Sequence, residues 1–189
     1  MAGLLLGKGA LIEALNQNSR TPLHLATLHG YIGTTELFLS KGASIEAIDK
    51  NRRTPLHIAA LDGHTHTVKL LLRKGASIHA MDKQNDTPLH LAAWGGHTDI
   101  VKLLLSKGTL VGVLNQSNKA PLHFAAHNGH TGVVELLLEK GTSLAAMGKD
   151  HNTPLHLAAL GGHTDVIALL LDKGAPIGAI DQDSCTPLC

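Results

Sequence analysis

The four residues Thr54-Pro55-Leu56-His57 decide the fold, because variants of them recur along the whole chain of 189 residues at a spacing of 33. The copies begin at Thr21, Thr54, Thr87, Ala120, Thr153 and Thr186. A second phrase, Leu70-Leu71-Leu72-Arg73-Lys74-Gly75, recurs at the same spacing in variants that end at Gly108, Gly141 and Gly174. Two phrases that stay in register over the chain indicate an array of internal repeats.

The residues of one period predict two short helices and a turn. Thr54 is a preferred N-cap, and Pro55 fits the first helical position, where no backbone N–H is needed. We expect a second helix from Thr65, because apolar residues then follow at the spacing of one buried helical face. Gly75 is a typical stop for that helix, and the polar stretch 76–86 predicts a turn or hairpin that leads into the next period.

The chain resembles the ankyrin repeat family, whose repeat is 33 residues long and carries the phrase Thr-Pro-Leu-His-x-Ala. That phrase stands here at residues 21–26, 87–92 and 153–158. The resemblance implies an all-α solenoid of stacked helix-turn-helix units, in which projecting β-hairpin turns and the first helices line a concave face. It makes residues 1–189 a single domain, in which partial units 1–15 and 181–189 flank complete repeats 16–48, 49–81, 82–114, 115–147 and 148–180.

Both ends of the array are incomplete in this repeat frame. Leu4-Leu5-Leu6 aligns with Leu70-Leu71-Leu72, so we expect the chain to open inside a second helix and to close one turn into a first helix. Neither end carries an evident polar capping unit, which repeat arrays normally need. We therefore expect a segment of a longer array, and end-to-end self-association through the uncapped terminal repeats as one form of partnership.

Several framework positions depart from the repeat pattern. Ala120 replaces the capping Thr, and Gly148 replaces the Asp or Asn that begins the other hairpins. The turn position that is usually Gly in this family holds Arg52 and His151 in two of the repeats, and both side chains adopt a left-handed conformation only at a cost. The hairpin geometry at these two positions is left open by the sequence, and the drift favours a natural protein over a designed one.

Charge and composition narrow the classes of partner. Sixteen Lys and Arg residues against 15 Asp and Glu give a formal net charge of +1, so no global field attracts nucleic acid or an anionic membrane. No apolar run approaches the roughly 18 residues that a membrane span needs, and we expect neither nucleic-acid binding nor membrane insertion. Cys185 and Cys189 lie too close to the end to build a disulfide framework. Free thiols in a reducing, cytoplasmic compartment fit this pattern.

Fourteen His residues raise the question of a metal or catalytic site. Most occupy two fixed positions of the repeat, and copies one repeat apart lie about 8 to 10 Å from each other, as packed helices do, whereas zinc bonds are about 2 Å long. We expect the His of each Thr-Pro-Leu-His phrase to be buried, neutral and hydrogen-bonded to backbone near the hairpin. The close pair His64 and His66 lacks further ligands beside it. Because no catalytic motif occurs either, we expect no enzyme activity, no metal and no cofactor.

The candidate binding residues are those that the scaffold does not need. In the family that the chain resembles, partners are usually contacted by residues near the hairpin tip and just after the Ala pair of the first helix. The hairpin position, six residues before each Thr, is apolar throughout: Leu15, Ile48, Met81, Leu114, Met147 and Ile180. The helix position, seven residues after the Thr, holds Leu28, Leu61, Trp94, His127 and Leu160. We interpret these two columns as a partner surface; the alternative is that neighbouring repeats partly cover them.

Trp94 is the expected centre of that surface. It is the only Trp and lies in the third of five complete repeats. We expect Gly95 and Gly96 to leave open space beside its ring, and Met81 and Leu114 to flank it. The alternative is a structural Trp in the core, and a Trp94→Ala substitution separates the two accounts.

These patterns favour a non-enzymatic scaffold that binds a partner protein on its concave face. Two alternatives stay open. The chain is compatible with a targeting or autoinhibitory arm of a larger multidomain enzyme whose catalytic domain lies outside these residues. It is also compatible, less well, with a designed or selected binder. Nothing in the sequence identifies the partner.

Overall fold

The computed structural model describes residues 11–189, so the helix expected at Leu4 to Leu6 lies outside the described residues. The described part contains ten α-helices, which form five consecutive pairs and which we number as units 1 to 5. The first helices are α2 (Pro22–Leu28), α4 (Pro55–Leu61), α6 (Pro88–Trp94), α8 (Pro121–His127) and α10 (Pro154–Leu160). The second helices are α3 (Ile32–Ser40), α5 (Thr65–Arg73), α7 (Thr98–Ser106), α9 (Thr131–Glu139) and α11 (Thr164–Asp172).

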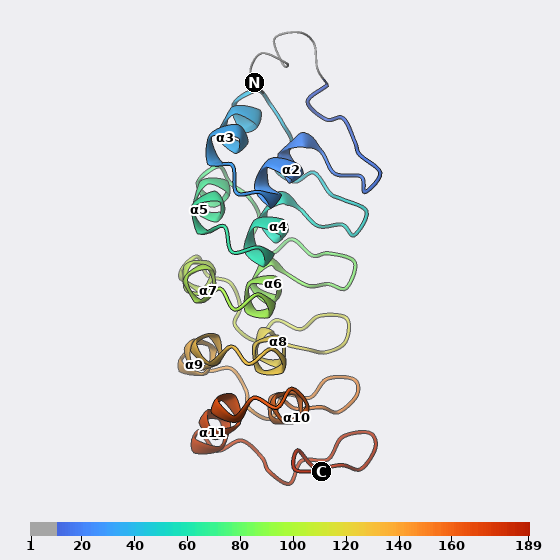
Figure 1. The fold of residues 1–189 in the computed structure, drawn as a ribbon, viewed down its shortest axis with the longest axis vertical. Helices are drawn as coiled ribbons and strands as arrows, with labels where there is room; N and C mark the ends of the chain where they lie inside the picture. Colours follow the sequence, from blue (N-terminus) through green and yellow to red (C-terminus); the bar gives the residue numbers. More distant parts are fainter. Residues whose placement is uncertain (1–10) are drawn as a thin grey trace.

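The units stack in single file and form two columns of helices. Figure 1 shows the first helices in one column, the second helices in the other, and the connecting loops projecting on the side of the first helices. This is the all-α solenoid that the repeat pattern predicts. No helix among residues 11–189 is long and apolar enough to cross a membrane.

Each first helix begins where the Thr-Pro-Leu-His phrase predicts. In unit 2 the His57 Nδ1 atom lies 3.1 Å from the backbone N of Thr54 and 2.9 Å from its Oγ1, and Pro55 occupies the first helical position. Ala120 has no hydroxyl to offer, yet its backbone N–H still donates to His123 Nδ1 at 3.1 Å. The hydrogen bond from the backbone N–H to the His ring is therefore kept at Ala120, and only the bonds of the Thr hydroxyl are lost.

The loops keep one geometry in spite of their sequence drift. The Asp49 N–H donates to the Arg53 carbonyl at 3.0 Å and closes the turn. Arg52 and His151 adopt φ angles of 59° and 57°, in the left-handed region that all the equivalent turn residues occupy. The question that the sequence left open is therefore answered in favour of a retained turn, at a conformational cost of about 1 kcal/mol or more for each side chain.

Neighbouring loops are joined by backbone hydrogen bonds. The Lys50 N–H donates to the Asn18 carbonyl at 3.0 Å, and the Lys83 N–H donates to the Asn51 carbonyl at 2.9 Å. Equivalent bonds continue to the last loop. Because every loop is tied to the one before it, the loop side of the molecule is a continuous surface.

The core lies between the two columns of helices. One cluster of buried residues runs from Leu56 in unit 2 to Ala175 after unit 5, and a smaller cluster around Leu23 and Phe38 fills unit 1. Ala59 and Ala60 are fully buried, and such small side chains let adjacent first helices approach closely. Units therefore share their core with their neighbours, as stacked repeats do.

Candidate functional site

The hairpin column is exposed along its whole length. Ile48 is 53 % exposed and Met81 44 %, although the next residue in each loop, Asp49 or Asp82, is buried. The buried carboxylate holds the turn: Asp49 Oδ1 accepts the backbone N–H groups of Asn51 at 2.8 Å and Arg53 at 3.0 Å. An anchored Asp beside an exposed apolar side chain recurs in successive loops. The other exposed members of the column are Leu15, Leu114, Met147 and Ile180.

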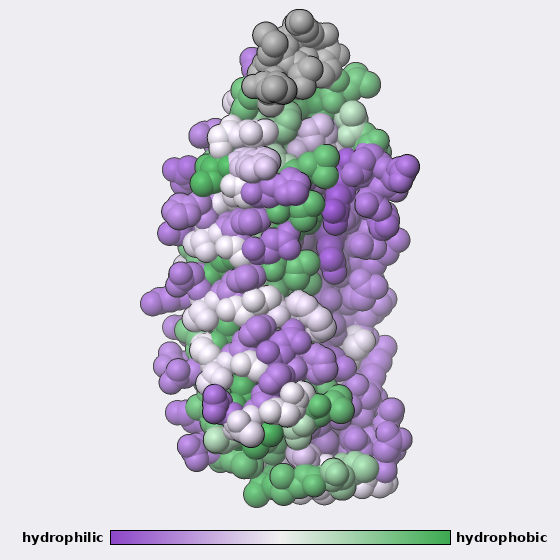
Figure 2. Space-filling view, in the orientation of Figure 1, coloured by the Kyte–Doolittle hydropathy of each residue, from purple (hydrophilic) through white to green (hydrophobic). Residues whose placement is uncertain are grey.

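The outer edge of the loops is polar instead. Figure 2 shows hydrophilic side chains gathered along the edge that the projecting loops form. Lys50 and Lys83, which follow the buried aspartates, are exposed residues of this edge. The apolar column is therefore bordered by charged groups, an arrangement that resembles the polar rim around the apolar core of an interface.

The helix column is more varied. Leu28, Leu61 and His127 are half-buried, whereas Trp94 is 43 % exposed and Leu160 is 76 % exposed. Neighbouring repeats cover the first three in part, which is what the alternative interpretation of the column predicts for them. Trp94 and Leu160 are the members with the largest free apolar surface.

Trp94 packs against the next unit and still faces solvent. Its ring centroid lies 5.7 Å from that of Phe124 in an edge-to-face arrangement, and 6.0 Å from that of His127. These side chains, together with Leu157 and Leu160, line a hollow of about 240 Å³ that spans units 3 to 5. Phe124 was missed as a site residue, although its place on the same helical turn as the Ala pair was a usable signal.

The space beside Trp94 is not open, which corrects the expectation for Gly95 and Gly96. A Cβ atom on Gly95 would lie 2.5 Å from His97 Nε2 and 2.6 Å from the Leu61 carbonyl oxygen. A Cβ atom on Gly96 would lie 2.6 Å from His130 Nδ1. A larger residue does not fit at either position, because the imidazole rings of His97 and His130 occupy the space where its side chain would lie.

Two columns of His side chains tie successive units together. In the first, His57 Nε2 lies 3.0 Å from the Asp86 carbonyl oxygen of the next loop. In the second, His97 Nε2 lies 2.9 Å from the carbonyl oxygen of Leu61, at the end of the preceding first helix. The repeated His residues are therefore structural, as expected.

Burial disfavours the charged form of four histidines in the first His column. It lowers the pKa of His24, His57 and His123 below the ordinary 6.5, and it lowers the pKa of His90 to about 4. A neutral imidazole can accept at Nδ1 and donate at Nε2, which matches a backbone N–H on one side and a carbonyl on the other. The expected burial and backbone hydrogen bonds of these four His side chains are confirmed, and their lowered pKa favours the neutral form.

Asp86 is a buried carboxyl that is hydrogen-bonded to an amide instead of being paired with a cation. Arg53 Nε lies 3.2 Å from Asp82 Oδ2, and Lys119 Nζ lies 3.0 Å from Asp150 Oδ2. Between these two ion pairs stands Asp86, whose Oδ1 accepts a hydrogen bond from Asn115 Nδ2 at 2.8 Å. Burial raises the pKa of Asp86 to about 6.

The titratable side chains of the described residues are spread along the stack of units. Among residues 11–189 no three His, Cys, Asp or Glu side chains are placed to hold a metal ion. His64 of the close pair uses Nε2 in a 2.9 Å hydrogen bond to the Leu28 carbonyl. Cys185 and Cys189 are free thiols, and Cys189 Sγ takes the place of the usual His by accepting the Thr186 N–H at 3.3 Å.

Comparison with known proteins gives one positive finding. A family model described as ankyrin repeats (3 copies) matches the chain over residues 33–114 and again over residues 89–181. A search of curated protein sequences finds no match. The matched stretch contains the second His column, all of the first except His24, and all of the hairpin column except Leu15.

Proposed function

Because the chain belongs to the ankyrin-repeat family, a non-catalytic class of modules that generally bind other proteins, we propose that it binds a partner protein along the hairpin column and the exposed part of the first helices. The single observation that carries this proposal is the column of half-exposed apolar side chains, one on each loop from Leu15 to Ile180. Contiguous exposed apolar surface is uncommon on soluble proteins unless a partner covers it.

The rigidity of the loops supports the same function. Ile48 and Met81 each stand beside a turn held by a buried Asp side chain, and backbone bonds join each loop to its neighbour. Such a surface loses little conformational freedom when it binds, and less of the interaction energy is then spent on ordering it. The partner therefore meets a preformed strip of apolar groups with charged groups at its edge.

Trp94 is our choice for the energetic centre of the strip. It combines a large exposed ring with support from Phe124, and it borders the hollow of about 240 Å³. Aromatic side chains that are central and held in place dominate many interfaces. Because Trp94 is 43 % exposed, we expect its truncation to lower the free energy of unfolding by about 1 to 2 kcal/mol, less than a core Trp would.

The test compares proteins retained from a cell lysate by the immobilised chain and by matched variants. We expect Met81→Ser and Trp94→Ala to lose the retained partner, and Leu110→Ser to keep it, since Leu110 is 69 % exposed but lies outside both columns. Circular dichroism checks that each variant is folded. Retention of the same partner by all three variants would remove both columns from the binding surface.

A further inference from the structure

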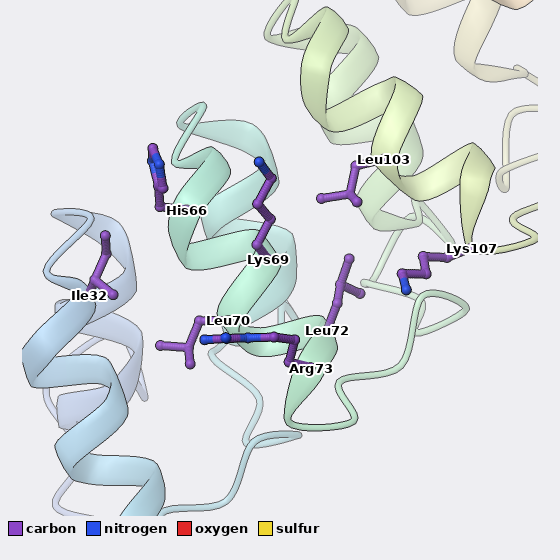
Figure 3. A pocket seen from close by; sticks show the side chains of 8 residues that line it. All are labelled: Ile32, His66, Lys69, Leu70, Leu72, Arg73, Leu103 and Lys107. Carbon is purple, nitrogen blue, oxygen red and sulfur yellow. The ribbon is translucent and has the colours of Figure 1, made fainter.

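A second apolar hollow lies on the opposite side of the molecule from the loops. It has a volume of about 430 Å³ and lies over the second helices of units 1 to 3. Figure 3 shows that its apolar side chains come from three successive second helices: Ile32 from α3, Leu70 and Leu72 from α5, and Leu103 from α7. We call this hollow the back groove.

The back groove exists because the second helices are less tightly packed than the first. Neighbouring first helices pack closely along the stack, whereas α5 and α7 are only loosely packed against each other. Leu72 and Leu103 lie at this loose contact and are only partly buried. Their apolar surface is available to a further group without any rearrangement of the core.

The border of the back groove is entirely basic. Lys69, Arg73 and Lys107 line it and are exposed, and His66 lies at its end near Ile32. Within residues 11–189 the ion pairs lie between loops, and none involves these cations. Asp99, which lines an adjacent shallow hollow with His66 and Lys69, forms no ion pair in the same part of the chain.

The combination of Lys69 with Arg73 is specific to unit 2, because the equivalent positions of unit 1 are Glu36 and Ser40. The positions equivalent to Lys69 and Arg73 in unit 4 are Glu135 and Glu139. A neighbouring hollow of about 490 Å³ between α7 and α9 has Glu139 beside its lysines. The repeat framework therefore does not require cations at the positions of Lys69 and Arg73, although the position of Lys107 is Lys in every unit.

From this placement we propose that the back groove binds an acidic, amphipathic helix of a second partner protein. Three cations spread around an apolar trough fit carboxylates that are spread along a helix at spacings of three and four residues, with apolar side chains between them. A fatty acid or a single phosphate carries its charge at one point and would leave most of these cations unpaired. The groove is separate from the hairpin column, so the module would hold two proteins at once.

The probe for this site is a fluorescein-labelled helical peptide of about 18 residues with Leu at every third or fourth position and Glu beside them. Fluorescence anisotropy should give a dissociation constant below about 100 μM, which is in the range of small transient interfaces, and the affinity should fall as salt is raised. The control peptide has Lys in place of every Glu and should not bind. Co-sedimentation with anionic vesicles tests for membrane binding. Analytical ultracentrifugation of the chain alone tests for self-association.

Matched variants locate the site. Arg73→Glu and Lys107→Glu should each weaken binding about fivefold, and Lys173→Glu, at the position of unit 5 that corresponds to Lys107, should not. Leu103→Ala should weaken binding where Leu169→Ala, its counterpart in α11, does not. Neither cation is buried, so the charge variants should fold, as circular dichroism will show.

The expected pattern of peptide and variant affinities supports the proposal. Equal binding of the Lys peptide, or equal weakening by Arg73→Glu and Lys173→Glu, would overturn it. Binding of anionic vesicles without binding of the peptide would assign the cations to a membrane surface. Self-association that Arg73→Glu abolishes, again without peptide binding, would assign the groove to a second copy of the chain; both results overturn the proposal.

Discussion

The junction between units 2 and 3 and the junction between units 4 and 5 have the same shape but different hydrogen bonds. At the first, Thr54 caps the helix, and His57 Nε2 reaches the carbonyl of Asp86, the residue just before Thr87. At the second, Ala120 provides no hydroxyl, and His123 Nε2 bonds to the Ala146 carbonyl at 3.0 Å, earlier in the loop than its counterpart. Backbone bonds between the loops are present at both junctions.

This difference separates what specifies the architecture from what stabilises it. The apolar core and the backbone bonds are common to both junctions, so they are sufficient to position the units. The capping hydroxyl and the buried Asp82 are present only at the first junction, and Gly148 stands at the corresponding position of the second. We therefore expect the second junction to open more readily than the first. Restoring the capping hydroxyl or the buried carboxylate there should raise the free energy of unfolding.

The largest expected effect comes from removing the bridging His at each junction. His57→Ala should lower the free energy of unfolding by about 3 kcal/mol, because it leaves buried polar groups unpaired and a cavity behind. His123→Ala should cost about 1 kcal/mol less, because it loses no bond to a capping hydroxyl. Urea unfolding followed by far-UV circular dichroism measures both, and equal losses would mean that the junctions do not differ in this respect.

The next effect concerns pH. Below about 6.5 the unfolded state protonates His side chains that stay neutral when folded, so stability is lost as pH falls. Asp86 acts in the opposite direction, because its pKa of about 6 in the folded state exceeds the ordinary 3.8. Its contribution is greatest below pH 3.8 and is lost as pH rises through about 6.

Asp86→Asn isolates this second contribution. The Asn side chain keeps an acceptor for Asn115 and removes the buried charge, so we expect a gain of about 2 kcal/mol at pH 8 that disappears near pH 4. Urea midpoints over that pH range give the measurement. A gain that is independent of pH would show that the charge of Asp86 is not the cause.

A smaller effect is expected from restoring the cap in unit 4. Ala120→Thr should raise the free energy of unfolding by about 1 kcal/mol, because the hydroxyl can accept from the His123 backbone N–H as Thr54 does from His57. Thr54→Ala is the matched control and should cost a similar amount. A loss of stability in Ala120→Thr would show that the buried methyl of Ala120 has no room for a larger side chain.

The smallest effect is an exchange between two turn residues. Asn85 and His151 have φ angles of 58° and 57°, and Asn tolerates this conformation better than His does. His151→Asn should raise the free energy of unfolding by about 0.5 kcal/mol, and Asn85→His should lower it by a similar amount. Thermal unfolding measures both changes as small shifts of the melting temperature. Changes of the same sign in both variants would mean that contacts of the side chains outweigh the backbone preference.

The sequence predicts the helices well because their signals are local. Thr54, Pro55 and Gly75 each act within one turn of the backbone, so the period alone places every helix pair. The shift of His123 to the Ala146 carbonyl depends on contacts between loops, which periodicity does not describe. The filled space beside Gly95 has the same origin, since His97 reaches across to Leu61 of the preceding unit.

The candidate site is predicted only in part for a related reason. The hairpin column is apolar in the sequence and exposed in the structure, but Leu28 and Leu61 of the helix column are half-covered by their neighbours. Leu70, Leu72 and Arg73 of the back groove belong to the second repeat phrase, but variants of that phrase recur along the chain and do not single out the groove. It emerges only when the loose contact between α5 and α7 is combined with charges that differ from unit to unit.

The bonds between neighbouring loops also determine how the molecule would respond to force. Each one joins residues about one repeat apart, such as Lys50 with Asn18 and Lys83 with Asn51. The length of chain released when one unit detaches is therefore the same wherever the array is pulled apart, and no bond between distant units has to break first. Stretched by its ends, the chain should behave as a series of equal links that yield one after another, giving a sawtooth of regular spacing.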